Sequence, residues 1–219
     1  MLTGLIGKKL VMEQDFTADG KVLPLTLVET GPCRVLQIKA KETDGYGAVK
    51  IAFGQGKGKY NKKPNLGEAK KAGFRKAPGK IVEIRGDFSD SVEVGQEITL
   101  DQVFKESDKV VVTGISKGRG FAGVIKRHGF HSGPQTHGQS DRLRAPGSIG
   151  QGTTLGRIHR GKKMPGHFGV DKVTVKNLTV FKIDKENNRL YLTGAVPGAR
   201  GGYVIVKKIE GKIGTKKLG

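Results

Sequence analysis

Residues 109–130 read KVVVTGISKGRGFAGVIKRHGF, and their character changes part of the way along. The first part, 109–116, is rich in β-branched residues, which is typical of a β-strand. From position 117 glycine and basic residues dominate. A helical spacing follows at 120–128, where apolar or planar residues recur at i, i+3, i+4 and i+7. The pattern predicts that the chain leaves a β-rich body near residue 116 and enters a segment of another kind.

That segment, 117–169, holds ten basic residues against Asp141 alone, together with 13 glycines and all five histidines. Only 12 of its 53 residues are apolar, too few to offset a backbone ordering entropy of about 1–2 kcal/mol per residue. An excursion of this length within a compact domain is usually functional or unfolded. We therefore predict a glycine-rich basic arm that a large polyanion could order.

A second basic stretch, 54–80, carries nine bases and one acid, Glu68. The other 139 residues hold 21 bases and 18 acids, so the net charge of +20 is concentrated in these two stretches. Such a charge excludes a cation-binding protein and favours nucleic acid or an anionic membrane surface as partner.

Outside the basic stretches the pattern is β. Apolar and polar residues alternate at 36–40 and 49–53. Many short strands with polar turns favour a closed or sandwich-like antiparallel sheet. The sequence predicts a mainly β protein whose body is 1–116 plus 170–219, with a basic loop at 54–80, an arm at 117–169 and short helices at 120–128 and 64–72. Further strands are expected at 5–14, 23–29, 81–85, 109–116, 173–183, 189–193 and 203–209.

The single cysteine, Cys33, excludes an internal disulfide and a multi-cysteine zinc site, and in a predicted strand it is most often a buried packing residue. No apolar run of eighteen residues and no leader pattern occur. We expect a soluble, cytoplasmic protein without a membrane partner. The histidines lack carboxylate or thiol companions at zinc spacing, so no metal is expected.

Two glycine motifs resemble nucleotide sites. Residues 118–123 match G-x-G-x-x-G after a strand, but the following forty residues break into glycine, proline and histidine instead of a βαβ unit. Residues 156–163 have phosphate-loop spacing, but Lys163 stands where a hydroxyl must hold magnesium. No Ser/His/Asp arrangement stands out. An enzyme and a cofactor are not expected, although a nucleotide-dependent enzyme using 118–123 stays open as a rival interpretation.

Basic side chains spaced by glycine, with planar groups between them, fit folded RNA better than duplex DNA because RNA offers irregular phosphate surfaces and splayed bases. The planar groups are Tyr60, Phe74, Phe121, Phe130 and Phe168. The predicted RNA-binding residues are Lys57, Lys59, Lys62, Lys63, Arg75, Lys117, Arg119, Lys126, Arg127, His128, His131, His137, Arg142, Arg144, Arg157, Arg160, Lys162 and Lys163.

Several motifs carry a resemblance to a known family. They are TGISKGRGFAGVIKRHGF at 113–130, THG at 136–138, PGSIGQ at 146–151, GKKMPG at 161–166, GAVPG at 194–198 and LIGKK at 5–9. With these motifs in their order along the chain, the sequence resembles the universal large-subunit ribosomal protein three family in its bacterial form. The match spans nearly the whole chain.

The resemblance implies a six-stranded β-barrel body and a long extension that penetrates 23S ribosomal RNA toward the peptidyl-transferase centre. It implies binding near the 3′ end of that RNA, a role in nucleating subunit assembly, and large-subunit proteins fourteen and nineteen as neighbours. The tip would map to residues 144–154. Gln151 matches a glutamine that a methyltransferase converts to N5-methylglutamine in some relatives. A structural, cytoplasmic component of the ribosome is expected; a free RNA-binding assembly factor with a similar barrel stays open.

Overall fold

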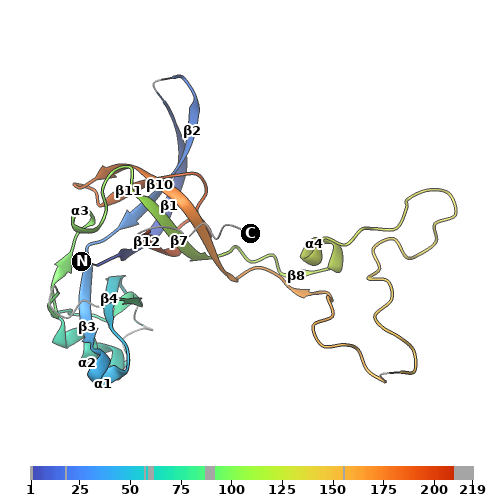
Figure 1. Ribbon diagram of the computed structural model, residues 1–219, viewed down its shortest axis with the longest axis horizontal. Helices are drawn as coiled ribbons and strands as arrows, with labels where there is room; N and C mark the ends of the chain where they lie inside the picture. Colours follow the sequence, from blue (N-terminus) through green and yellow to red (C-terminus); the bar gives the residue numbers. More distant parts are fainter. Residues whose placement is uncertain are drawn as a thin grey trace, which may run out of the picture. The chain divides into compact units, whose positions relative to one another are not determined.

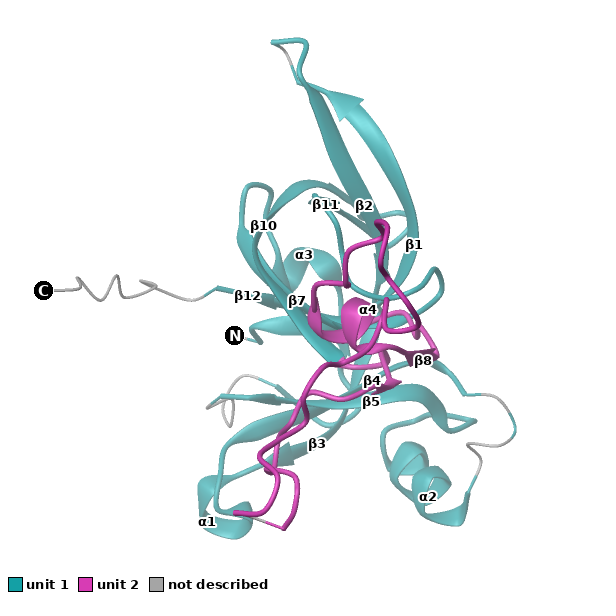
Figure 2. Cartoon of the chain, turned by 90° about the vertical axis from the view of Figure 1, so that its right-hand side faces the viewer, with its two compact units in different colours: residues 1–115, 172–219 teal, residues 116–171 magenta. Residues whose placement is uncertain are grey.

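The computed structural model describes residues 2–17, 19–56, 58, 62–86, 92–154 and 156–209. The chain divides into two compact units, residues 1–115 with 172–219, and residues 116–171 (Figure 2). In chain order the elements are β1 (Gly4–Phe16), β2 (Val22–Thr30), β3 (Cys33–Lys39), α1 (Lys41–Asp44), β4 (Ala48–Gln55), α2 (Lys63–Lys71), β5 (Pro78–Arg85), β6 (Glu97–Ile98), α3 (Leu100–Val103), β7 (Lys109–Ile115), β8 (Phe121–Ala122), α4 (Val124–His128), β9 (Gly166–His167), β10 (Lys172–Asp184), β11 (Arg189–Thr193) and β12 (Tyr203–Lys208).

Six strands of the first unit form a closed antiparallel barrel in the order β1-β12-β7-β10-β11-β2 (Figure 1). Alternate residues of β7 and β12 are buried, so one side of each strand faces the core. Val112 pairs with Val206 on one side and Val175 on the other. Closure pairs both edges of each strand where the ladders meet, which removes exposed sheet edges.

A second sheet, β5-β4-β3-β6, belongs to the same unit. Val35, Val49, Ile51 and Ile84 of this sheet are completely buried and join one hydrophobic cluster with the barrel strands. Of the described residues from 113 to 177, none is among the buried members of that cluster, and Val175 of β10 packs against it. The first unit therefore has a core of its own.

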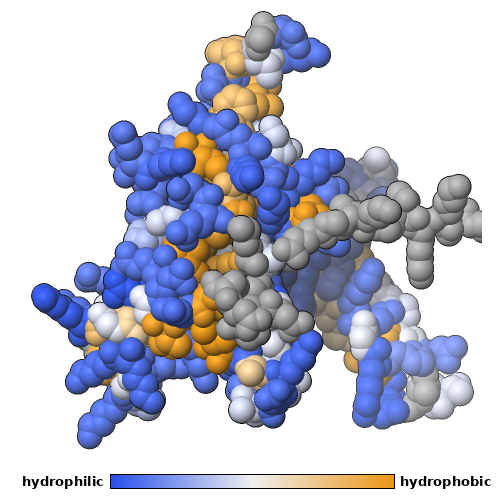
Figure 3. All heavy atoms as spheres, turned by 60° about the vertical axis from the view of Figure 1, so that its left-hand side comes forward, coloured by the Kyte–Doolittle hydropathy of each residue, from blue (hydrophilic) through white to orange (hydrophobic). Residues whose placement is uncertain are grey.

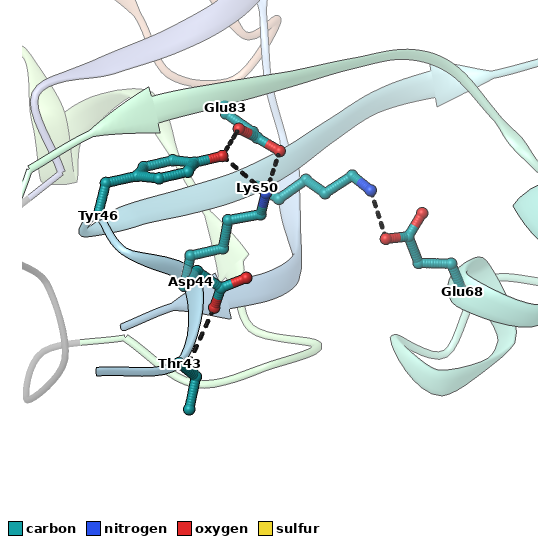
Figure 4. Close-up of polar contacts among 7 residues, drawn as sticks. Thr43, Asp44, Tyr46, Lys50, Glu68 and Glu83 are labelled. Carbon is teal, nitrogen blue, oxygen red and sulfur yellow. Dashed lines mark hydrogen bonds and ion pairs between the residues drawn. The ribbon is translucent and has the colours of Figure 1, made fainter. Parts of the chain in front are cut away.

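Helix α2 lies beside this second sheet. Pro64 stands in its first turn, where the missing backbone N–H costs nothing. The Lys50 ammonium of β4 forms an ion pair with Glu68 of α2 (Figure 4). The Tyr46 hydroxyl donates to Glu83 at 2.8 Å, and the Lys39 ammonium lies 3.0 Å from the same carboxylate. The hydrogen bonds from Lys39 and Tyr46 lower the pKa of Glu83, so this network stays charged at neutral pH.

The second unit contains little regular structure. Strands β8 and β9 form a two-stranded antiparallel ladder in which Phe121 pairs with His167 and Ala122 with Gly166. Helix α4 follows β8 and ends at Gly129, which adopts a left-handed conformation with φ of 71°. The described residues between 129 and 165 form neither helix nor strand.

The prediction of a mainly β protein with few helices is confirmed. Strands expected at 109–116 and 189–193 are β7 and β11, and the helix expected at 64–72 is α2. The helix expected over 120–128 is wrong in its first half, because Phe121 and Ala122 pair with β9 and α4 begins only at Val124.

Candidate nucleic-acid interface

The segments by which the chain enters and leaves the second unit, near residues 119–120 and 168–169, are joined by backbone hydrogen bonds. We call this part the base of the second unit. The amide of Arg119 donates to the carbonyl of Phe168 at 2.8 Å, and the amide of Phe168 donates to Gly120 at 2.9 Å. Gly169 has φ of +81°, and a Cβ there would lie 2.9 Å from the Cα of Gly118. Glycine at this position therefore allows the outgoing and returning segments to approach closely.

Two predicted RNA-binding residues lie within this base. Arg127 and His128, from α4, are half-buried. The Arg127 guanidinium donates to the carbonyl of Met164 at 2.8 Å, and His128 Nε2 lies 3.0 Å from the same oxygen. A Cβ on Gly166 would lie 2.5 Å from Arg127 Nη1, so the guanidinium packs directly on that glycine. These two side chains hold the return of the chain against α4.

Exposed planar groups accompany basic ones at the same base. Phe121 is 71% exposed and meets His167 edge to face, with ring centroids 6.0 Å apart. The Arg119 guanidinium lies 5.0 Å from the centre of the Phe168 ring. Phe168 is half-buried, whereas Phe121 and Arg119 are exposed. Aromatic rings and arginine guanidinium planes are each surfaces on which unstacked RNA bases stack.

Ten further predicted residues of the second unit are exposed; one precedes β8, one lies on α4, and the other eight spread over the long loop between α4 and β9. They are Lys117, Lys126, His131, His137, Arg142, Arg144, Arg157, Arg160, Lys162 and Lys163. Arg142 lies 3.9 Å from Asp141, and both side chains are more than 80% exposed, so this ion pair binds the arginine weakly. The loop thus presents basic groups with almost no internal acid to neutralise them. Gln151 is exposed as well.

The first unit contributes a second basic area near α2. Lys62, Lys63 and Arg75 are exposed there. The predicted residues Lys57 and Lys59, and the planar Tyr60, lie outside the described residues. A groove of about 650 Å³ runs beside Arg75, lined also by Phe74, Lys76 and Arg34. The Arg34 guanidinium lies 5.0 Å from the Phe74 ring centre and forms an ion pair with Glu97.

Sequence reasoning missed Arg34. It belongs to β3, where a single basic residue looks like an ordinary solvated side chain of a strand. Only the fold brings it to Phe74, forty residues along the chain.

The structure also bears on the other kinds of site considered from the sequence: a nucleotide site, a reactive cysteine and a metal site. Residues 118–123 contain β8, whose ladder partner is antiparallel, and a helix of five residues follows them, so the described residues after the glycine motif form no βαβ unit. Cys33 is fully buried, and burial raises the pKa of its thiol to about 12, which makes it a poor nucleophile. Among the described residues no three His, Cys, Asp or Glu side chains gather to hold a metal ion.

Among the described residues, none of the helices has the length and apolar character that crossing a membrane requires.

Comparison with known proteins identifies the family. The family described as "Ribosomal protein L3" matches residues 37–213. A protein of Herpetosiphon aurantiacus named "Large ribosomal subunit protein uL3" is 47% identical over 212 residues, which cover 95% of this chain and 97% of that protein. Proteins of the same name from Dehalococcoides mccartyi and a Synechococcus species are 48% and 45% identical, over 95% and 99% of this chain and 98% and 97% of their own lengths.

Similarity at this level over nearly the full length makes the chain a ribosomal protein and not an enzyme. Its partners are therefore ribosomal RNA and other ribosomal proteins. This chain belongs to the ribosomal protein L3 family and is a constituent of the large ribosomal subunit.

Proposed function

We propose that this chain is a primary binder of 23S ribosomal RNA, which attaches near the 3′ end of that RNA and nucleates assembly of the large subunit. The body, 1–116 with 170–219, provides a folded anchor with the basic loop 54–80. The arm, 117–169, enters the RNA and buttresses the peptidyl-transferase centre without performing chemistry. The observation that carries this proposal is the exposed basic loop of the second unit, which has almost no acids of its own.

The proposed mechanism is electrostatic and steric. Each exposed Arg or Lys that meets a phosphate releases condensed counterions, which favours association. Arginine also donates two parallel hydrogen bonds to a phosphate, which fixes orientation. Glycines along the arm carry no side chain and let the backbone approach RNA closely. The side chains of Arg127 and His128 support this surface by closing its base, besides any contact with RNA.

The tip at 144–154 would lie deepest in the RNA, and large-subunit proteins fourteen and nineteen would be neighbours of the body. Gln151 is exposed in the free chain, so a glutamine methyltransferase could reach its amide before assembly. Methylation of the amide nitrogen would add apolar volume and remove one hydrogen-bond donor.

The test neutralises four exposed arginines of the arm: Arg142→Gln, Arg144→Gln, Arg157→Gln and Arg160→Gln together. Binding to a 3′-terminal fragment of 23S ribosomal RNA is measured from low to high salt. Losing four phosphate contacts should reduce the slope of log K against log salt by about 3, since each contact contributes about 0.7–0.9.

The matched control neutralises four exposed lysines of the body, Lys21, Lys105, Lys109 and Lys185. We expect it to change the slope by less than the arginine variant does. Equal changes in the two variants would show that the arm is no more an RNA interface than the rest of the surface.

A further inference from the structure

The β1–β2 hairpin continues beyond the strands of the barrel that support it (Figure 1). In β1, residues 4–8 pair with β12, whereas residues 12–16 pair with β2 alone. In β2, pairing with β11 covers residues 25–29 and does not include 22–24. Within the described part of the chain the hairpin end, 12–24, is therefore a two-stranded ribbon, which the Gly194 amide joins only at its lower end by donating to the Pro24 carbonyl at 2.8 Å. Such a ribbon is marginally stable in water without a surface to pack against.

One face of this ribbon is apolar and exposed. Phe16 pairs directly with Val22, and these side chains are 61% and 57% exposed. Met12, 50% exposed, lies on the same face because alternate residues of a strand point to the same side. Figure 3 shows hydrophobic residues at the end of the hairpin with hydrophilic ones beside them. A contiguous exposed apolar face of this kind marks an interaction site more often than isolated apolar residues do.

The charge of the hairpin end is opposite to that of the whole chain. Glu13, Asp15 and Asp19 are exposed there, with Lys21 as the one base, so residues 12–24 carry a net −2 in a protein of net +20. RNA phosphates repel three exposed carboxylates. A cationic protein surface attracts them, and proteins that neutralise ribosomal RNA are cationic for the same reason that this chain is.

We propose that the β1–β2 hairpin end docks on a neighbouring protein of the large subunit, one that presents basic side chains around an apolar patch. Met12, Phe16 and Val22 would bury their exposed face against that patch. Glu13 and Asp15 alternate with Met12 and Phe16 and so point to the opposite face of the narrow ribbon, where together with Asp19 they would pair with basic side chains of the partner that reach past the edges of the hairpin end. The hairpin end is thus a protein-binding element, separate from the basic RNA interface. The inference rests on membership of the large subunit and goes beyond the proposed RNA binding.

The test places the photo-crosslinker benzoylphenylalanine at position 16 of the full chain, which is then assembled into large subunits. Irradiation should attach position 16 to one basic ribosomal protein. A second chain carries the same probe with Glu13→Gln, Asp15→Asn and Asp19→Asn, and its crosslink yield should fall several-fold because the charge complementarity is gone. A matched control instead carries Glu42→Gln and Asp44→Asn, two exposed acids of α1, and should keep the full yield.

Crosslinking of position 16 to RNA would overturn the proposal, as would the absence of any crosslink or a protein crosslink that ignores the three acids. All substituted side chains are exposed, so thermal unfolding of each variant should match the parent and excludes misfolding as the cause. The same probe at position 121, whose ring is exposed in the second unit, should crosslink to RNA. Failure there would count against the proposed function and leave the hairpin result standing.

Discussion

Arg127 and Lys126 are neighbours on α4 with the same charge, but the structure gives them different tasks. Arg127 is half-buried and donates to the Met164 carbonyl, whereas Lys126 is exposed. We predict that Arg127→Ala loosens the base of the arm in the free protein and that Lys126→Ala does not.

The free energy that Arg127→Ala removes from closure of the base can be worked out from the hydrogen bond that is lost. A bond from a charged donor contributes about 1.5–3 kcal/mol, and partial exposure together with the remaining His128 contact to Met164 lowers this to about 1–2 kcal/mol. Opening of the base should then become about 5–30 times more frequent.

Hydrogen exchange without RNA is the assay, because the amides of Arg119 and Phe168 close the base and report its opening. In Arg127→Ala these two amides should exchange about 5–30 times faster than in the parent, and in Lys126→Ala at the parent rate. Lys126→Ala removes an exposed charge and should lower the salt slope of RNA binding by about 0.7–0.9, whereas Arg127→Ala should lower it by less because its half-buried guanidinium is engaged with Met164. Equal exchange rates in the two variants would refute a structural role for Arg127.

Three further predictions concern the body. Replacing residues 140–160 by a short Gly-Ser linker should leave the thermal unfolding of the barrel unchanged, because the core cluster contains none of the described residues of that loop; a large loss of stability would contradict the separate core. Leu190→Ala, at a fully buried barrel position, should cost about 2–5 kcal/mol in denaturant unfolding, whereas Val173→Ala, at a position 39% exposed, should cost much less; similar costs would place Leu190 outside the core. The Cys33 pKa of about 12 exceeds its ordinary value of 9.0, so above pH 9 the unfolded chain releases a proton that the native chain keeps. Between pH 8 and 10 the parent should therefore lose about 1.4 kcal/mol more stability than Cys33→Ala, and parallel pH curves would show that the thiol is accessible to water.

The sequence pattern predicted those elements that depend on residues close together in the chain. The strand at 109–116 was predictable because β7 buries Val110 and Val112 on one face and leaves Lys109 and Ile115 exposed. Helix α3 carries a capping box between Thr99 and Gln102, a signal present in the sequence, but its four residues are too few to show a helical period.

The features that the sequence did not predict depend on contacts between residues far apart in the chain. The helical spacing at 120–128 was misleading because Phe121 and Ala122 find their partners in β9, more than forty residues away. The bonds of Arg127 and His128 to Met164 span 37 and 36 residues, so the sequence pattern predicted these side chains only as RNA-binding residues and did not show their structural contact. The apolar face of the β1–β2 hairpin likewise emerges only from the register that places Phe16 opposite Val22.

The proposed recognition of 23S ribosomal RNA can be tested by measuring how the purified chain binds a 3′-terminal fragment of that RNA and an unrelated RNA of equal length. Both affinities should fall steeply as salt rises, because counterions are released when phosphates are neutralised. We expect a preference for the ribosomal fragment to persist at high salt, where only shape-specific contacts remain. Equal decay of the two affinities, with no preference left, would contradict the proposed recognition.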